Sequence, residues 1–386
     1  MHHLLASAPS TSWQHFTSPL EQWSVMPSFV VGEYLFMACA LIALIHARRC
    51  GRAHLLIWFA ALIAGTANDL IFMGLPIVNN FWQAQAQFMI TERLPLYIPC
   101  VYVCFMYYPT VAVRRLGLDA LGTALATGLL ACLFYAPYDI VGAKFLWWTW
   151  HDTDPPILAR LLGAPVSSSL WVLTFVATFA FLLDRVIARA GEDELSPKLF
   201  ALGLALVAGC TTVLMVIQMT VLQQLDGGVP GYRAFGTAVL LYLGLLVWRV
   251  RKQLEPVEPA RHEDGPVLHA ARAYFLTLIA IMALFDPATH QSTGVHQTAG
   301  ECYVEQTDIT GFTRYEFLCT EDFEEDFTFE CTQAPPADPP TRWYTVCGRP
   351  HSSYGTWLGG VLALGLAGIL LFSLIFGARE RLRARA

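Results

Sequence analysis

The sequence predicts an all-α membrane protein: a polytopic helical bundle of about nine transmembrane helices with a small disulfide-linked external module. Hydrophobic residues make up 55% of the 386 residues and charged residues only 14%, whereas charged residues are roughly 25% of a soluble globular protein. The apolar residues form runs long enough to span a membrane, and the positive residues gather in alternate loops. With a formal net charge of −6, the chain is neither a typical soluble protein nor a nucleic-acid binder with a basic surface.

Nine apolar runs are long enough to cross a membrane, because about 20 helical residues span about 30 Å of hydrocarbon. They cover residues 28–47, 55–76, 92–112, 118–138, 167–188, 199–222, 235–250, 267–285 and 356–377. We expect the first seven to form a membrane core over residues 27–252. A linker over 253–266 then leads to the eighth helix, within 267–286, and the ninth occupies 356–377.

Positive residues are divided unevenly between the two sides of this topology. Sixteen of the 24 Lys and Arg residues fall in one set of alternate loops and in the basic tail 378–386, and six fall in the other set. Positive residues near helix ends tend to remain in the cytoplasm. The count therefore predicts an extracellular or lumenal N-terminus and a cytoplasmic C-terminus. Residues 1–26 then form an external segment, which lacks the basic and apolar regions of a cleavable signal.

The segment 287–355 differs from the rest of the chain in charge and in cysteine content. It holds eleven Asp and Glu residues against three Lys and Arg, and it faces an oxidising compartment in the predicted topology. Two disulfide bonds, with three possible pairings, are therefore predicted among Cys302, Cys319, Cys331 and Cys347. A zinc site is the alternative, but no Cys-x-x-Cys spacing favours it. The acidic run 321–326 is typical of a solvated face; weak Ca²⁺ binding is the alternative, although the spacing is not that of an EF-hand loop.

Sequence motifs for nucleotide, dinucleotide or zinc-protease chemistry are absent, so we expect no cofactor and no metal site. The candidate functional residues are polar residues at membrane depth. A charged side chain there is costly and usually faces a cavity or pairs with another residue. Glu33 and Asp69 lie roughly 8 to 9 Å below the outer surface by the helical rise. Asn68 is beside Asp69, and Arg93 opens the third span on the same side, so we expect both to contact a substrate.

Two interpretations of these acids stay open. In one, Glu33 or Asp69 pairs with Arg93 and holds three helices together, which is poor evidence of catalysis. In the other, a carboxyl group in a low-dielectric environment keeps its proton near neutral pH. Such a group can serve as a general acid or as a proton-coupling group.

A second group of candidate residues follows the fourth span. Trp148 and Trp150 are typical of an aromatic belt at a membrane interface. His151 and Asp154 add titratable groups on the outer side, and a belt alone does not require them. We therefore predict that these four residues line the mouth of a binding site, with Asp139 as an assisting acid.

Residues from the same region carry a resemblance. They are Gly74, Phe81-Trp82, Arg93-Leu94-Pro95-Leu96, Asp139, Gly142, Trp148-x-Trp150, Asp154-Pro155, Gly163-x-Pro165 and Trp171. In their order they resemble the membrane-embedded carotenoid-biosynthesis family that contains the carotenoid 1,2-hydratases and is related to the heterodimeric lycopene cyclases. The resemblance covers roughly residues 28–250 and implies a seven-helix core with chemistry on an isoprenoid.

The external segment resembles a different group of proteins. The strings Tyr315-x-x-Leu318-Cys319, Glu321-Asp322-Phe323 and Trp343-Tyr-Thr-Val-Cys347-Gly are similar to uncharacterised multi-pass membrane proteins of eukaryotes. This resemblance implies no particular activity.

Three functions from different classes are consistent with the sequence. The first is a membrane-embedded lyase or isomerase acting on an isoprenoid or other apolar lipid, with Glu33, Asp69 and Asp139 as its acids. The second is a proton-coupled carrier or receptor-like protein that uses the same carboxyls. The third is a non-catalytic scaffold whose external module binds a partner. A cavity beside the acids with access from lipid favours the enzyme, a water-filled route favours the carrier, and close packing favours the scaffold.

Overall fold

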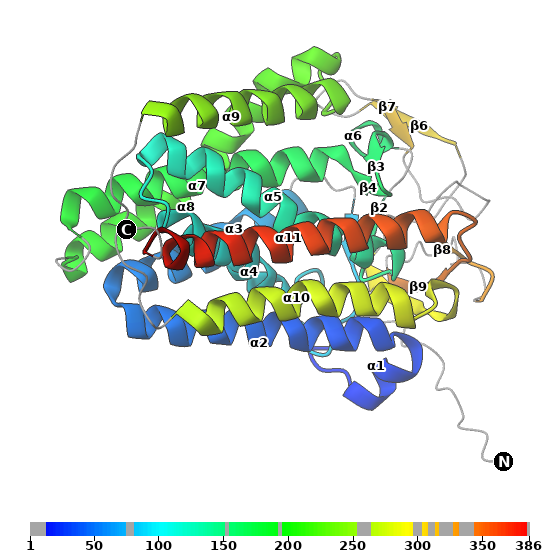
Figure 1. Ribbon diagram of the computed structural model, residues 1–386. Helices are drawn as coiled ribbons and strands as arrows, with labels where there is room; N and C mark the ends of the chain where they lie inside the picture. The colour runs from blue at the N-terminus through cyan, green and yellow to red at the C-terminus, as the bar shows by residue number, and fades with distance from the viewer. Residues whose placement is uncertain are drawn as a thin grey trace.

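The long helices of the chain form one bundle, and the short strands gather at one end of it (Figure 1). The computed structural model describes residues 13–74, 81–150, 154–191, 195–252, 264–295, 303–307, 313–315, 327–331 and 343–383. The long helices are α2 (Pro27–Cys50), α3 (Arg52–Gly74), α4 (Tyr97–Arg114), α5 (Ala120–Lys144), α7 (Val166–Ala190), α8 (Pro197–Leu222), α9 (Tyr232–Lys252), α10 (Gly265–Leu284) and α11 (Tyr354–Arg383). These helices confirm the predicted all-α bundle.

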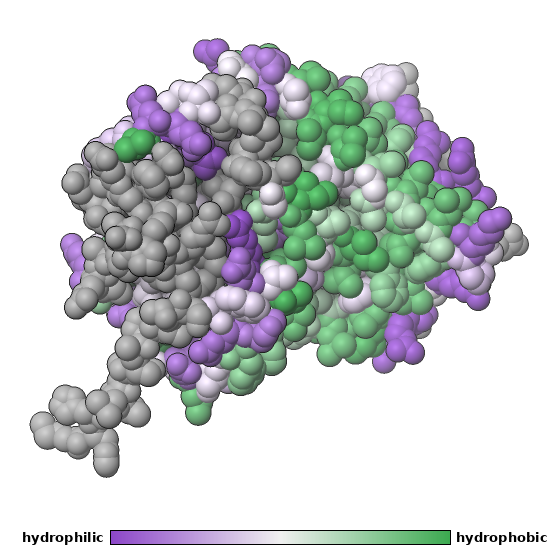
Figure 2. All heavy atoms as spheres, turned by 180° about the vertical axis from the view of Figure 1, so that it is seen from behind, coloured by the Kyte–Doolittle hydropathy of each residue, from purple (hydrophilic) through white to green (hydrophobic). Residues whose placement is uncertain are grey.

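Among the described residues, eight of these helices are long and apolar enough to cross a membrane, and α4 is the long helix that is not among them. Figure 2 shows a broad band of hydrophobic side chains across the helices, with hydrophilic residues toward the two ends of the bundle. Large apolar side chains are exposed on the outer helices, for example Leu202, Val213, Leu240 and Leu370. A soluble protein rarely exposes so large an apolar surface. The chain is therefore an integral multi-pass membrane protein.

Helix α4 lies inside the bundle, where it packs against α2, α3 and α5. Its 18 residues extend about 27 Å, and nearly all of its side chains are buried. Because protein rather than lipid surrounds it, α4 tolerates four tyrosines and two prolines: Tyr97, Tyr102, Tyr107, Tyr108, Pro99 and Pro109. These residues lower its hydropathy below that of the outer helices.

The third span was predicted to begin near residue 92, but α4 begins at Tyr97. Residues before it form a turn in which the Leu94 amide donates to the Thr91 carbonyl (3.3 Å). Pro95 disfavours helical backbone at the residue that precedes it. The helix therefore starts after this proline, and Arg93 lies in the loop rather than in the span.

Short elements form a layer at the end of the bundle where α2 begins. They are α1 (Pro19–Val25), β1 (Phe81–Gln83), β2 (Trp148–Trp150), α6 (Pro155–Leu158), β3 (Arg160–Leu161), β4 (Ala164–Pro165), η2 (Gln223–Asp226), η4 (Pro287–Thr289), β5 (Gln291–Val295), β6 (Glu305–Thr307), β7 (Thr313–Tyr315), β8 (Phe327–Thr328) and β9 (Trp343–Gly348). Strands β1 and β2 pair antiparallel, as do β3 with β4 and β6 with β7. Strand β9 lies between β5 and β8 in an antiparallel sheet of three.

The segment between α10 and α11, called the external segment after its predicted side of the membrane, packs on the loops of the core. The Gln85 amide donates to the Thr293 carbonyl of β5 (2.6 Å), and Ala84 forms a bridge with Gly294. A Cβ atom at Gly294 would come within 2.6 Å of the Gln83 carbonyl oxygen, so glycine permits this close approach. The external segment is thus joined by backbone pairing to the loop that follows α3.

A buried histidine makes a second connection between the external segment and the core. His290 Nε2 lies 2.7 Å from the Ser28 hydroxyl, and the Trp147 indole N–H donates to the same hydroxyl (3.1 Å). His290 Nδ1 lies 3.0 Å from the Asp286 carbonyl oxygen. If Nδ1 carries the proton, it donates to that carbonyl and Nε2 accepts from Ser28. Burial favours this neutral form and lowers the pKa of His290 from 6.5 to about 4.

One disulfide bond lies within the described part of the external segment. It joins Cys331, after β8, to Cys347 in β9, with a Cα–Cα distance of 5.9 Å. One of the two predicted disulfides is thereby confirmed. Cys302 and Cys319 lie outside the described residues. Six cysteines of the membrane core are free, as the sequence predicted: Cys39, Cys50, Cys100, Cys104, Cys132 and Cys210.

We predict that the Cys331–Cys347 bond protects both thiols and stabilises the external segment. In folded, non-reduced protein, alkylation followed by peptide mass spectrometry should find both cysteines unlabelled and a bridged peptide that contains them. Cys331→Ser should lower the free energy of unfolding of the segment by roughly 2 to 5 kcal/mol. Cys302 and Cys319 are then the remaining pair, and a peptide joining either of them to Cys331 would contradict this pairing.

We predict that acidification loosens the external segment through His290. The pKa of His290 is lowered in the folded state, so the unfolded chain takes up its proton first as the pH falls. The stabilisation is complete above about pH 6.5, is lost progressively toward about pH 4, and amounts to at most about 3 kcal/mol. The unfolding temperature should therefore fall more between pH 7 and pH 4.5 for wild type than for His290→Gln. The exposed His269 supplies the control, and His269→Gln should behave as wild type.

Candidate functional site

A cavity of about 390 Å³ lies at the end of the bundle that carries the strands. Side chains from α3, α4, α5, α7 and α8 form its walls, and residues near β1, β2 and β7 form its outer side. Nine of the 27 lining residues are aromatic, including Tyr102, Phe105, Tyr135, Tyr138, Trp148 and Trp171. The polar lining residues include Asn68, Asp69, Gln83, Asp154, Ser168 and Arg314. The cavity therefore combines an apolar interior with a few acids and polar groups.

Asp69 contributes a buried carboxyl group to this cavity from near the end of α3. The Tyr102 hydroxyl donates to Asp69 Oδ1 (2.9 Å), while within the described residues no donor reaches Oδ2. The neighbouring Asn68 accepts a hydrogen bond from Thr212 of α8 (3.2 Å). One carboxyl oxygen is thus held in position, and the other is available to a ligand.

Glycines allow the aromatic wall to pack closely on the helices. A Cβ atom at Gly65 would overlap the ring of Tyr102, and one at Gly142 would overlap the ring of Trp148. The ring of Trp148 also lies 4.9 Å from that of Tyr138. Side chains larger than hydrogen at either glycine would therefore displace a ring that forms the cavity wall.

A strained residue leads the chain from α5 into this aromatic wall. Leu146 has φ of +58°, a left-handed conformation that costs a non-glycine residue about 1 to 3 kcal/mol. It is fully buried, as is Trp147 beside it. After this turn, the Trp147 indole N–H donates to the Ser28 hydroxyl (3.1 Å). The next residue, Trp148, lines the cavity.

The outer side of the cavity carries an ion pair between the core and the external segment. Arg314, in β7, lies 3.0 Å from a carboxylate oxygen of Asp154, and both residues line the cavity. Only 1% of Asp154 is exposed. Gln83 of β1 lies at the cavity too and accepts a hydrogen bond from Tyr97 (2.9 Å). The external segment therefore contributes a charged side chain to the site.

Asp139 does not line the cavity directly but is connected to it through Ser168. The Ser168 hydroxyl lies within hydrogen-bond distance of both the Asp139 carboxyl and the Pro165 carbonyl. One hydroxyl has a single proton to donate. Both contacts are hydrogen bonds at the same time only when the Asp139 carboxyl also carries a proton and donates it to Ser168.

Glu33 lies apart from this group. It is buried in α2, where its Oε1 accepts from the Gln87 backbone amide (3.0 Å), and it is not among the residues that line the cavity. The guanidinium of Arg93 donates to the Met73 carbonyl (2.9 Å). Within the described residues no ion pair joins Arg93 to Glu33 or Asp69; the Glu33 carboxylate accepts from the Gln87 amide and the Asp69 carboxylate from the Tyr102 hydroxyl.

The predicted aromatic mouth is partly in place. Trp148 and Trp150 pair with β1 and line the cavity, and in the described part of the chain neither indole N–H has an acceptor. His151 lies outside the described residues. Of the predicted site residues, the structure brings together Asn68, Asp69, Trp148, Trp150 and Asp154, with Asp139 behind them.

Several residues of the cavity were not predicted from the sequence. Tyr102 and Tyr135 could have been found, because tyrosines at helical spacing in an otherwise apolar span mark a face that protein covers. Arg314 could not have been found, because only the folded external segment brings it to Asp154. Side chains able to hold a metal also lie together at the other end of α2, where His46 and Cys50 are close to Asp264.

Comparison with known proteins gives a family but no activity. No curated protein and no solved structure matches the chain. Residues 12–376 match a family described as a domain of unknown function, DUF7802. The match extends from the segment before α1 to the end of the membrane-spanning part of α11. The chain therefore belongs to the DUF7802 family.

Proposed function

We propose that this protein is a membrane-embedded isomerase or lyase that acts on an unsaturated lipid bound in the aromatic cavity. The observation that carries the proposal is the Asp69 carboxyl group, which has one oxygen fixed by Tyr102 and the other without a donor at the cavity wall. A volume of about 390 Å³ is within the usual range of small-molecule sites, roughly 300 to 1,000 Å³. The low polarity of the wall favours an apolar ligand.

In the proposed reaction, Asp69 acts as the general acid. The Asp69 carboxyl gives its proton to one carbon of a double bond, whose electron pair forms the new C–H bond and leaves a carbocation on the other carbon. Faces of aromatic rings attract a cation, and Tyr102, Tyr138 and Trp148 line the same cavity as Asp69. Loss of a proton from a neighbouring carbon to the Asp69 carboxylate re-forms the acid and moves the double bond. No atoms are gained or lost by the lipid, so the step is an isomerisation.

Other polar groups support roles in binding and positioning. The indole N–H groups of Trp148 and Trp150 suit a lipid that carries a hydroxyl or carbonyl oxygen, because both donors lack an acceptor within the described residues. Asp139 acts through Ser168 and serves as a positioning residue. The resemblance of residues 28–250 to the carotenoid-biosynthesis family supports an isoprenoid as the lipid class.

A gated carrier or receptor is the second candidate. The Asp154–Arg314 ion pair (3.0 Å) favours it, because a charge from the external segment could open or close the cavity when that segment moves. In this function Asp69 binds and releases a proton as the ligand passes, without making or breaking a carbon–hydrogen bond. The scaffold function depends on the acidic run 321–326, which lies outside the described residues.

The orientation in the membrane is part of the proposal. We assign the Arg-rich end of the bundle to the cytoplasm by the distribution of positive charge. The N-terminus, the cavity and the disulfide-bonded segment then face the extracellular or lumenal side, and a disulfide persists in such compartments.

We predict that Asp69 transfers protons to a bound lipid. Protein incubated with its co-purified lipids in deuterated water should introduce deuterium at alkene carbons, which mass spectrometry of the extracted lipids would detect. Asp69→Asn should keep the volume of the side chain and reduce the rate of incorporation about a hundredfold or more. Glu33→Gln is the matched control, because Glu33 is a buried acid away from the cavity, and it should incorporate at the wild-type rate. Bound lipid without deuterium in wild type would favour the carrier, and incorporation by Asp69→Asn would exclude Asp69 as the acid.

We predict that filling the cavity expels the lipid. Val216 of α8 lines the cavity and Val221 of the same helix is exposed without lining it. Val216→Trp should lower the amount of the cavity-bound lipid that co-purifies with the protein by about tenfold. This is equivalent to about 1.4 kcal/mol of binding free energy. Val221→Trp should leave it unchanged. Equal lipid content in the two variants would show that the ligand binds elsewhere.

A further inference from the structure

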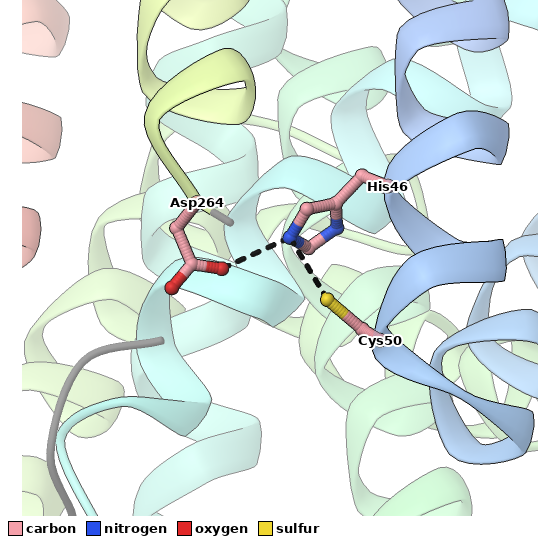
Figure 3. A group of neighbouring side chains, drawn as sticks. All are labelled: His46, Cys50 and Asp264. Carbon is pink, nitrogen blue, oxygen red and sulfur yellow. Dashed lines mark hydrogen bonds and ion pairs between the residues drawn. The ribbon is translucent and has the colours of Figure 1, made fainter. Parts of the chain in front are cut away.

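Three potential metal ligands converge at the end of the bundle opposite the cavity (Figure 3). His46 and Cys50 are four residues apart in the last turns of α2, so they share one face of the helix. Asp264 precedes the first residue of α10. All three side chains are buried, and their ligand atoms lie within 4.8 Å of one another. No short sequence motif contains these three residues, because Asp264 is far from His46 and Cys50 in the sequence.

Two potential metal ligands approach the same ring nitrogen of His46. Nε2 of His46 lies 2.9 Å from Asp264 Oδ1 and 3.3 Å from Cys50 Sγ. An imidazole nitrogen has one in-plane direction, which holds either one proton or one lone pair, yet two ligand atoms approach it. A metal ion in that direction would be bound by all three atoms at once.

The distances are compatible with a tetrahedral zinc ion. With a Zn–N bond of about 2.0 Å and a Zn–S bond of about 2.3 Å, the nitrogen and sulfur would lie about 3.5 Å apart. The measured separation is 3.3 Å. The corresponding nitrogen–oxygen separation would be about 3.3 Å, against 2.9 Å, so metal binding requires shifts of a few tenths of an ångström.

The surrounding residues also fit a metal site. Nδ1 of His46 lies 2.7 Å from the Tyr107 hydroxyl, and a hydrogen bond at the second ring nitrogen is typical of metal-bound histidine. Arg115 forms an ion pair with Asp264, which orients the carboxylate. A dication bound by one thiolate, one carboxylate and one neutral imidazole would have no net charge, and the Arg115 guanidinium beside Asp264 would add one positive charge.

We propose that His46, Cys50 and Asp264 bind a zinc-type divalent transition metal. Three protein ligands leave a fourth position for water or another donor. Within the described residues, His54 of α3 offers a further imidazole, with its ring centroid 5.6 Å from that of His46. The ion would tie the end of α2 to the start of α10.

The test measures metal content of the full-length protein purified in detergent after equilibration with Zn²⁺. Wild type should retain one zinc ion per chain, and the Co²⁺-substituted protein should show a thiolate-to-cobalt absorption band in the near ultraviolet. Cys50→Ala should remove the band and the metal. Tyr107→Phe should retain the ligands but weaken zinc binding roughly 10- to 100-fold.

Matched controls remove a residue of the same type as each proposed ligand from another position. Cys210→Ala removes a cysteine of intermediate exposure, His269→Ala an exposed histidine of α10, and Asp184→Asn a carboxylate that pairs with Arg114 (3.0 Å). All three should keep wild-type metal content. No zinc and no cobalt band in folded wild type would overturn the proposal in favour of a hydrogen-bonded His46–Asp264 pair. A band that persists in Cys50→Ala would overturn the assignment of the thiolate ligand.

Discussion

The enclosure of α4 by other helices is the constraint on which the rest of the bundle depends. Buried hydroxyl groups away from water must find partners within the protein. Two tyrosines of α4 find such partners on α2 and α3. Tyr108 donates to the Cys39 carbonyl of α2 (2.8 Å), and Tyr102 donates to Asp69 of α3 (2.9 Å). Because these bonds run across helix interfaces, they set the rotation of α2 and α3 about their axes. The position of Asp69 at the cavity follows from the same packing.

The sequence predicts which helices exist better than it predicts which of their faces meet. Hydropathy places the outer spans because lipid contact requires apolar side chains on them. The helical rise predicts a similar depth for Glu33 and Asp69, but depth says nothing about the rotation of each helix about its axis. In the folded chain Asp69 reaches the cavity and Glu33 instead accepts from the Gln87 backbone. Rotation depends on contacts between helices, which a single sequence does not display.

Long-range pairs are the other part of the site that the sequence does not reveal. Trp148, Trp150 and Asp154 are close together in the chain, and their shared position at the end of a span was enough to predict a mouth. Arg314 reaches Asp154 only through the pairing of β6 with β7, and Asp264 reaches His46 only through the packing of α10 on α2. In each case one partner is a charged residue that composition alone would assign to a solvated surface.

The ion pair at the outer side of the cavity has a consequence for biosynthesis. A membrane protein is inserted as its chain emerges from the ribosome, so its earlier helices can assemble before its later ones exist. Asp154 precedes α7, whereas Arg314 follows α10 and can reach Asp154 only after α10 and the segment that follows it have been made and packed on the bundle. A chain interrupted before that point would contain Asp69 and the aromatic wall but would leave Asp154 buried without this countercharge. Completion of the site is thereby coupled to completion of the chain.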